Sequence, residues 1–99
     1  MNRLLLAQTR ARRRSLGGHG TLMARCLAVG LPVASSCAGR GACGKCVMRI
    51  LEGAEALSPA APHELAVLLR NDAAPDERLG CQTRVEDPFT QVVITTGYW

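Results

Sequence analysis

A chain of 99 residues predicts one domain, spanning residues 1–99, with one modest core and no room for a second. Its 47% hydrophobic and 20% charged residues are typical of a chain that folds, and no apolar run approaches the roughly 18 residues of a membrane span. The three aromatic residues, Phe89, Tyr98 and Trp99, are too few to stack single-stranded nucleic acid, so no nucleic-acid partner is expected. A large multidomain enzyme is excluded, whereas a site built around a metal cofactor is not.

Charge is divided unevenly along the chain. The net charge of +4 combines nine Lys and Arg without one acid in residues 1–50 with eight acids and three Arg in residues 51–99. Five arginines lie close together in sequence: Arg10, Arg12, Arg13, Arg14 and Arg25. They form either one basic loop on a mixed surface or a patch that attracts an acidic partner or a membrane surface.

The first twenty residues form an atypical, Arg-rich segment. Residues 3–7 are predicted to be a short strand or the start of a helix, and residues 11–16 a returning strand. Arginines make up most of that second strand, so we expect it to be exposed or at a sheet edge. Because a sheet that contains both strands needs them, we expect residues 1–20 to be retained. Their composition also fits a mitochondrial transit peptide, which is the alternative.

A helix is predicted after the glycines that follow this segment. Thr21 is a suitable N-cap, and the helix should run to Val29 with Gly30 just beyond its end. Leu22, Cys26 and Val29 share one face of this helix, which predicts that this face packs on a core.

The second half of the chain predicts an alternation of strands and a short helix. The expected elements are a strand over 46–51, a helix from Pro62 to about Asn71, a polar loop over 72–80, and strands over 82–86 and 91–95. The order is typical of an α+β fold, with one sheet and one main helix packed on it.

The five cysteines are odd in number and follow no clear secretory signal, which disfavours a disulfide framework. Three of them occur as Cys37-x5-Cys43-x2-Cys46, and Cys81 follows after 34 further residues. Cys26 stands apart in an apolar setting and is expected to be a buried free thiol.

This spacing predicts a [2Fe–2S] cluster, which needs four thiolates. The plant-type arrangement takes three from one loop and one from a distant segment, as C-x4-C-x2-C…C, and here the first gap is one residue longer. Glycines at positions 39, 41 and 44 would let the loop backbone approach the cluster closely. The predicted ligands are Cys37, Cys43, Cys46 and Cys81.

A zinc site and a Rieske centre are two other metal centres that use cysteine ligands. Four thiolates also suit a tetrahedral zinc ion, but zinc sites usually present two C-x2–4-C pairs, and Cys81 belongs to no second pair. A Rieske centre needs two histidines beside its cysteines. His19 and His63 are far from the cysteines in sequence, and we expect both at the surface.

The cysteine segments resemble those of the [2Fe–2S] ferredoxins of β-grasp fold. The resemblance lies in SCAGRGACGKC over residues 36–46 and RLGCQ over residues 78–82, and it covers residues 20–96. The C-x5-C-x2-C gap is similar to that of adrenodoxin-like ferredoxins. The loop is closer still to ferredoxin domains of sodium-pumping NADH:quinone reductases and corrinoid-protein activators. The resemblance implies a ubiquitin-like β-grasp fold with one mixed sheet, one main helix and one short helix.

The resemblance also implies one-electron transfer between a reductase and an acceptor enzyme. No nucleophile–base pair, phosphate loop or substrate-pocket motif is visible, so the chain is expected to be an electron carrier and not an enzyme. A redox-sensing iron–sulfur module and a zinc-stabilised interaction domain are the alternatives. We expect a monomer that forms transient complexes, in the bacterial cytoplasm, or in the mitochondrial matrix if residues 1–20 are a transit peptide.

Three further features have two interpretations each. Most ferredoxins of this kind are acidic and this chain is basic, yet five acids near Cys81 in sequence offer a patch for a basic partner: Asp72, Asp76, Glu77, Glu86 and Asp87. Glu64 and Arg78 are either an ion pair that ties the second helix to the Cys81 segment or two solvated charges. Tyr98 and Trp99 are either a partner contact or a tail folded on the core.

Overall fold

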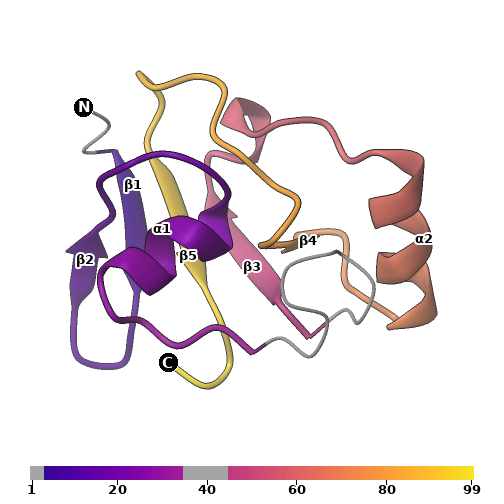
Figure 1. Cartoon of the computed structure of the whole chain (residues 1–99), viewed down its shortest axis with the longest axis horizontal. Helices are drawn as coiled ribbons and strands as arrows, with labels where there is room; N and C mark the ends of the chain where they lie inside the picture. Colours follow the sequence, from indigo (N-terminus) through magenta and orange to yellow (C-terminus); the bar gives the residue numbers. More distant parts are fainter. Residues whose placement is uncertain (1–3, 35–44) are drawn as a thin grey trace.

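One mixed sheet with two helices organises the chain, whose computed structural model describes residues 4–34 and 45–99. The elements are β1 (Leu5–Gln8), β2 (Arg13–Ser15), α1 (Leu22–Ala28), β3 (Val47–Glu52), the 3-10 helix η1 (Ala54–Ala56), α2 (Pro62–Arg70), β4 (Glu77–Leu79) and β5 (Val92–Thr95). The strand order is β2-β1-β5-β3-β4, with β1 and β5 parallel and the other pairs antiparallel. Figure 1 shows α1 across one face of this sheet and α2 beyond β4.

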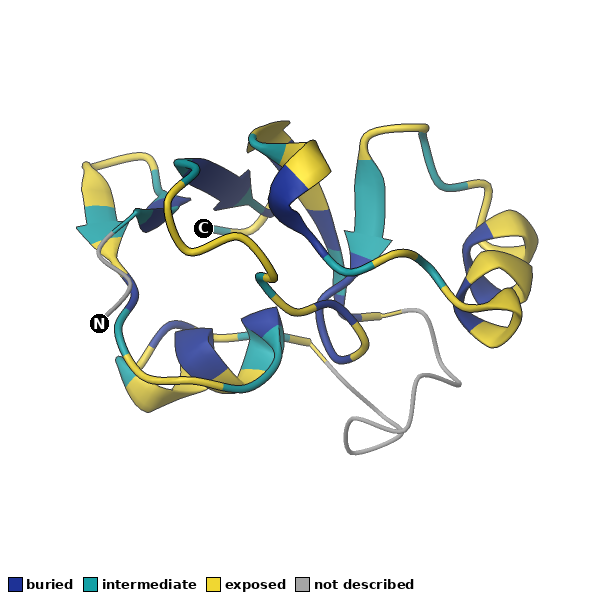
Figure 2. Ribbon diagram, turned by 90° about the horizontal axis from the view of Figure 1, so that it is seen from above, coloured by how far each residue is buried: buried dark blue, intermediate teal, exposed yellow. Residues whose placement is uncertain are grey.

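The core lies between α1 and the sheet. Leu22 and Cys26 of α1 are fully buried, and in Figure 2 the buried side of this helix faces the strands. The middle strand, β5, buries Val92, Val93 and Ile94 completely, because it has a neighbouring strand on each edge. A second cluster, made of Cys46, Val67, Leu68, Leu79 and Cys81, packs between α2 and the β3–β4 end of the sheet.

The N-terminal segment forms the two predicted strands. β1 pairs with β2 on one side and with β5 on the other, so residues 5–8 are internal to the sheet. β2 is the edge strand, as its arginines indicated. Arg13 donates through Nε to Gln8 Oε1 at 2.8 Å, and Arg14 donates through Nη2 to the Val29 carbonyl at 3.0 Å. These two arginines therefore help to hold the edge strand to β1 and to the end of α1.

Both helices begin and end close to where the sequence predicted. The Ala24 N–H donates to Thr21 Oγ1 at 3.2 Å, and Gly30 has a φ of +83°, which suits a glycine after a helix end. α2 begins at Pro62 and is followed by Asn71 as its C-cap. With seven and nine residues, the helices are of similar length. Within the part of the chain that is described, neither is long and apolar enough to cross a membrane.

Two strand predictions near Cys81 were wrong. Residues 82–86 make only isolated bridges, Thr21 with Arg84 and Leu57 with Val85, because they contact two separate segments in turn. Conversely, β4 lies inside the predicted polar loop. Its sequence, Glu-Arg-Leu, has little strand propensity of its own, and it is extended because it pairs with residues 47–49 of β3. The predicted strands over 46–51 and 91–95 agree with β3 and β5 to within one residue at each end.

Cys26 is the buried free thiol that the sequence predicted. Burial removes water from the thiolate and raises the pKa of Cys26 to about 12. The unfolded chain therefore releases this proton near pH 9 while the folded chain keeps it. Stability that is present below pH 9 is lost as the pH rises toward 12.

We predict that Cys26→Ala removes part of the alkaline loss of stability. Between pH 7.5 and 10.5 the wild type should lose about 2 kcal/mol more than the variant, since each pH unit between the two pKa values is equivalent to about 1.4 kcal/mol. Urea unfolding of both proteins at the two pH values measures this. Equal losses in the two proteins would show that the Cys26 thiol does not titrate in this way.

Candidate metal centre

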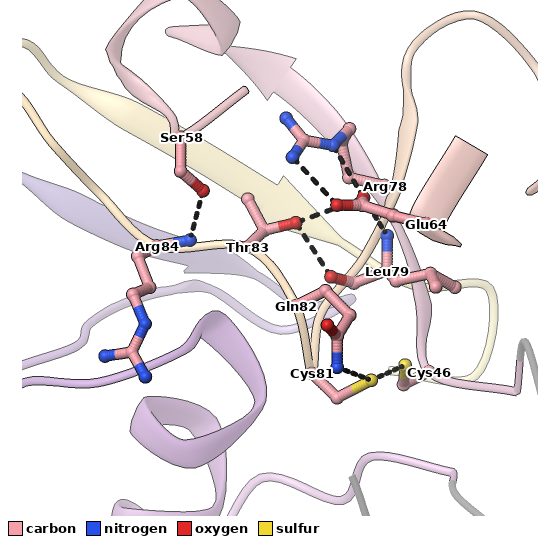
Figure 3. Close-up of polar contacts among 9 residues, drawn as sticks. All are labelled: Cys46, Ser58, Glu64, Arg78, Leu79, Cys81, Gln82, Thr83 and Arg84. Carbon is pink, nitrogen blue, oxygen red and sulfur yellow. Dashed lines mark hydrogen bonds and ion pairs between the residues drawn. The ribbon is translucent and has the colours of Figure 1, made fainter. Parts of the chain in front are cut away.

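Pairing of β3 with β4 brings two of the predicted ligands together. Cys46 comes directly before β3, and Cys81 follows β4 by one intervening residue. Val47 is paired with Leu79, and the Gly80 N–H donates to the Cys46 carbonyl at 3.0 Å. The Sγ atoms of Cys46 and Cys81 consequently lie 3.1 Å apart, with residue exposures of 1% and 6% (Figure 3).

This thiol pair is close to the spacing of two thiolates that share one metal ion. No disulfide joins the two sulfur atoms, because 3.1 Å is far longer than the about 2.05 Å of a disulfide bond. Two thiolates bound to one tetrahedral ion at about 2.3 Å lie about 3.8 Å apart. A small outward rotation of the two side chains would reach that spacing, so the pair fits one metal position of a metal–thiolate centre.

The remaining predicted site residues are placed as follows. Cys37 and Cys43 lie outside the described residues. Within residues 4–34 and 45–99, no three metal-ligating side chains gather at one point. Cys26 belongs to the core between α1 and the sheet, whereas Cys46 and Cys81 belong to the other cluster. His19 and His63 are exposed, as expected.

Gly80 permits the close approach of the two cysteine segments. A Cβ at this position would lie 2.8 Å from Met48 Cε and 3.1 Å from the Cys46 carbonyl oxygen. Its own carbonyl accepts from the Met23 N–H at 2.9 Å, which ties the segment to α1 as well. A side chain here would have to displace a fully buried methionine. The glycine directly before Cys81 was the sequence signal for this contact.

Glu64 on α2 fastens the segment that leads to Cys81. Its carboxylate is 1% exposed and accepts from Arg78 Nε at 2.7 Å and from Arg78 Nη2 at 3.1 Å. It also accepts from the Leu79 N–H at 3.1 Å, two residues before Cys81 (Figure 3). The predicted ion pair is thus confirmed, and the alternative of two solvated charges is wrong.

Thr83 completes this arrangement on the far side of Cys81. Its buried hydroxyl donates to the Leu79 carbonyl at 2.7 Å and lies 3.4 Å from Glu64 Oε2. Burying a carboxylate is costly unless it is paired and hydrogen-bonded, and here the charge of Arg78 and the Leu79 N–H supply both. The turn that carries Cys81 is therefore held at both ends.

The acids near Cys81 in sequence are partly engaged with local partners. Asp76 forms an exposed ion pair with Arg49 at 3.3 Å, and Glu77 Oε1 accepts from the Ala74 N–H at 2.6 Å. Asp87 accepts from the Thr90 hydroxyl and the Phe89 N–H, and these hydrogen bonds hold the pKa of its carboxyl below the usual value. The predicted acidic patch is therefore partly occupied by interactions within the chain.

The fold and the thiol pair fit a small metal–thiolate protein, and comparisons with known proteins identify its family. The model of the 2Fe-2S iron-sulfur cluster binding domain matches residues 11–86. The chain belongs to this family. Its cofactor is a [2Fe–2S] cluster, and the predicted resemblance to the [2Fe–2S] ferredoxins is confirmed.

Curated relatives agree with this assignment. The chain is 32% identical over 72 residues, 73% of its length, to one subunit of the Na(+)-translocating NADH-quinone reductase of Pasteurella multocida. It is also 32% identical over 73 residues to the corresponding subunit of the Histophilus somni reductase. The chain spans only 17% of the length of each of these relatives.

Solved structures show the same fold. Trichomonas vaginalis ferredoxin matches with a TM-score of 0.76 and 24% identity, covering 93% of this chain and 98% of that one. The ISC-like [2Fe-2S] ferredoxin of Pseudomonas putida matches with a TM-score of 0.80 and 19% identity, covering 96% and 92%. The covalent putidaredoxin reductase–putidaredoxin complex matches with a TM-score of 0.73 and 20% identity, covering 92% and 94%. The expected β-grasp ferredoxin fold is confirmed.

We predict that Glu64→Ala destabilises the protein strongly and lowers its cluster content. Removing one partner of a buried pair leaves an uncompensated charge and costs about 3 kcal/mol. Asp76→Ala is the matched control, because it breaks the exposed ion pair with Arg49 and should cost less than about 1 kcal/mol. Thermal unfolding and iron content of both variants measure the difference. Similar melting temperatures in the two would remove the structural role of Glu64.

Proposed function

We propose that this chain is a one-electron carrier whose [2Fe–2S] cluster is held by Cys37, Cys43, Cys46 and Cys81. The observation that carries the proposal is the 3.1 Å approach of the Cys46 and Cys81 thiols within a domain of the cluster-binding family. These two residues supply one half of a four-thiolate set. The two further cysteines of the C-x5-C-x2-C segment would supply the other half.

The surroundings of the thiol pair support electron exchange with a partner. Each cysteine is buried but has an exposed sequence neighbour, Lys45 beside Cys46 and Gln82 beside Cys81. The thiol pair therefore lies next to exposed residues on this side. Gln82 Nε2 donates to Cys81 Sγ at 3.7 Å, and hydrogen bonds to ligand sulfur favour the more negative reduced state.

The proposed partners are a reductase that supplies the electron and an enzyme that accepts it. A similar structure is that of putidaredoxin in complex with its reductase, and the curated relatives are subunits of NADH-quinone reductases. In this proposal the chain binds its partners transiently, makes and breaks no bond of a substrate, and is not an enzyme by itself. Because β1 lies inside the sheet, we propose that the segment of residues 1–20 is retained in the working protein. The location that we propose for it is the bacterial cytoplasm.

Electron paramagnetic resonance on anaerobically purified protein tests the proposal directly. About two irons and two sulfides per chain, a silent oxidised state and an S = 1/2 signal after dithionite would support a [2Fe–2S] carrier. The signal should return unchanged over repeated cycles of oxidation and reduction. A cluster that is destroyed by oxidation would indicate a redox sensor instead, and a colourless protein holding zinc would refute the proposal.

The ligand assignment predicts opposite results for two cysteines. Cys81→Ala should abolish cluster assembly or leave only a small fraction of the wild-type cluster content, because one thiolate of the four is missing. Cys26→Ala, the control, should retain wild-type iron and sulfide, because this thiol lies in the other core cluster. Iron and sulfide analysis with visible absorption measures both. Wild-type cluster content in Cys81→Ala would overturn the assignment.

A further inference from the structure

The segment over residues 31–34 leads from α1 toward the ligand cysteines and has no regular structure of its own. Its backbone is nevertheless held at three points. The Leu31 N–H donates to the Cys26 carbonyl at 3.0 Å, at the end of α1. The other two contacts come from residues more than sixty positions away. Trp99 Nε1 donates to the Pro32 carbonyl at 2.8 Å, and the Ala34 N–H donates to the Tyr98 hydroxyl at 2.9 Å.

The two aromatic residues lie just beyond the largely buried central strand of the sheet. They follow β5, whose residues Val92, Val93 and Ile94 are fully buried between β1 and β3. The backbone N–H of Trp99 donates to the Thr96 carbonyl at 3.5 Å. The Trp99 ring is partly buried and packs against the core under α1. Tyr98 and Trp99 are thus folded onto the chain, as one of the two interpretations predicted, and 48% of Tyr98 stays exposed.

Val33 connects the same segment to the metal centre. Its side chain packs against the core under α1 and also against the cluster that contains Cys46 and Cys81. A displacement of residues 32–34 would therefore change the packing around the thiol pair. The two aromatic hydrogen bonds flank Val33 on either side.

We propose that Tyr98 and Trp99 are positioning residues of the iron–sulfur centre. Through Pro32 and Ala34 they hold Val33 against the packing around Cys46 and Cys81. This slows cluster loss and affects the reduction potential, which depends on the surroundings and exposure of the cluster. This inference rests on the proposed ligation by Cys46 and Cys81 and goes beyond it, because it assigns a role to two residues outside the proposed ligand set.

The experiment compares Tyr98→Phe, Trp99→Phe and the double variant with the wild type. Tyr98→Phe removes only the acceptor oxygen, and Trp99→Phe removes the donor while keeping an aromatic ring. Phe89→Leu is the control, because Phe89 is 88% exposed and its side chain has no partner among the described residues. Three quantities are measured on anaerobic protein: the rate of cluster loss to an iron chelator, the reduction potential, and hydrogen exchange of the peptide spanning residues 31–36.

Each single variant should lose its cluster about five-fold faster, as expected for one missing hydrogen bond, and the double variant more than about ten-fold faster. The double variant should also shift the reduction potential and exchange faster over residues 31–36, while Phe89→Leu matches the wild type. Wild-type chelation rate and potential in the double variant would overturn the inference. If the wild type binds no cluster, the proposed function fails, and unchanged exchange over residues 31–36 would then refute the positioning role as well.

Discussion

The antiparallel pairing of β3 with β4 is the contact on which the metal centre depends. It sets Val47 opposite Leu79, and the Gly80 N–H continues the pairing to the Cys46 carbonyl. Two cysteines that are 35 positions apart in sequence thereby come within 3.1 Å of each other. β4 is only three residues long and sits at the edge of the sheet, so this pairing by itself is weak. The surrounding contacts have to stabilise it.

Those contacts are supplied by α2, and they combine packing with one buried charge. Val67 and Leu68 pack against Leu79 and the two cysteines, and Glu64 accepts from both the side chain of Arg78 and the Leu79 N–H. A buried carboxylate of this kind adds little net stability compared with an apolar residue, but it is costly to leave unpaired. It therefore favours one register of β4 over its neighbours, because a slip of one residue would separate Glu64 from both donors.

The segment that carries the C-x5-C-x2-C cysteines is anchored by the residues that come before and after it. At its start, Leu31, Pro32 and Ala34 bind the end of α1 and the two aromatic residues that follow β5. At its end, Cys46 leads directly into β3, next to β5 in the sheet. The same central strand thus supports both sides of the centre. The basic hairpin of β1 and β2 lies at the opposite edge of the sheet from β4, so its arginines are separate from the surface near Cys46 and Cys81 (Figure 1).

The sequence alone determined the parts of this protein that depend on local chemistry. Thr21 and Gly30 bound α1, Pro62 begins α2, and the cysteine spacing with its glycines indicated a [2Fe–2S] cluster before any contact was known. Tertiary structure alone decided that β4 is a strand, that residues 82–86 are not, and that Tyr98 and Trp99 bind residues 32–34. The physical reason is the range of the interactions. A helix cap or a ligand spacing depends on residues that are close in sequence. A strand of sequence Glu-Arg-Leu, in contrast, forms only because it hydrogen-bonds to a distant segment.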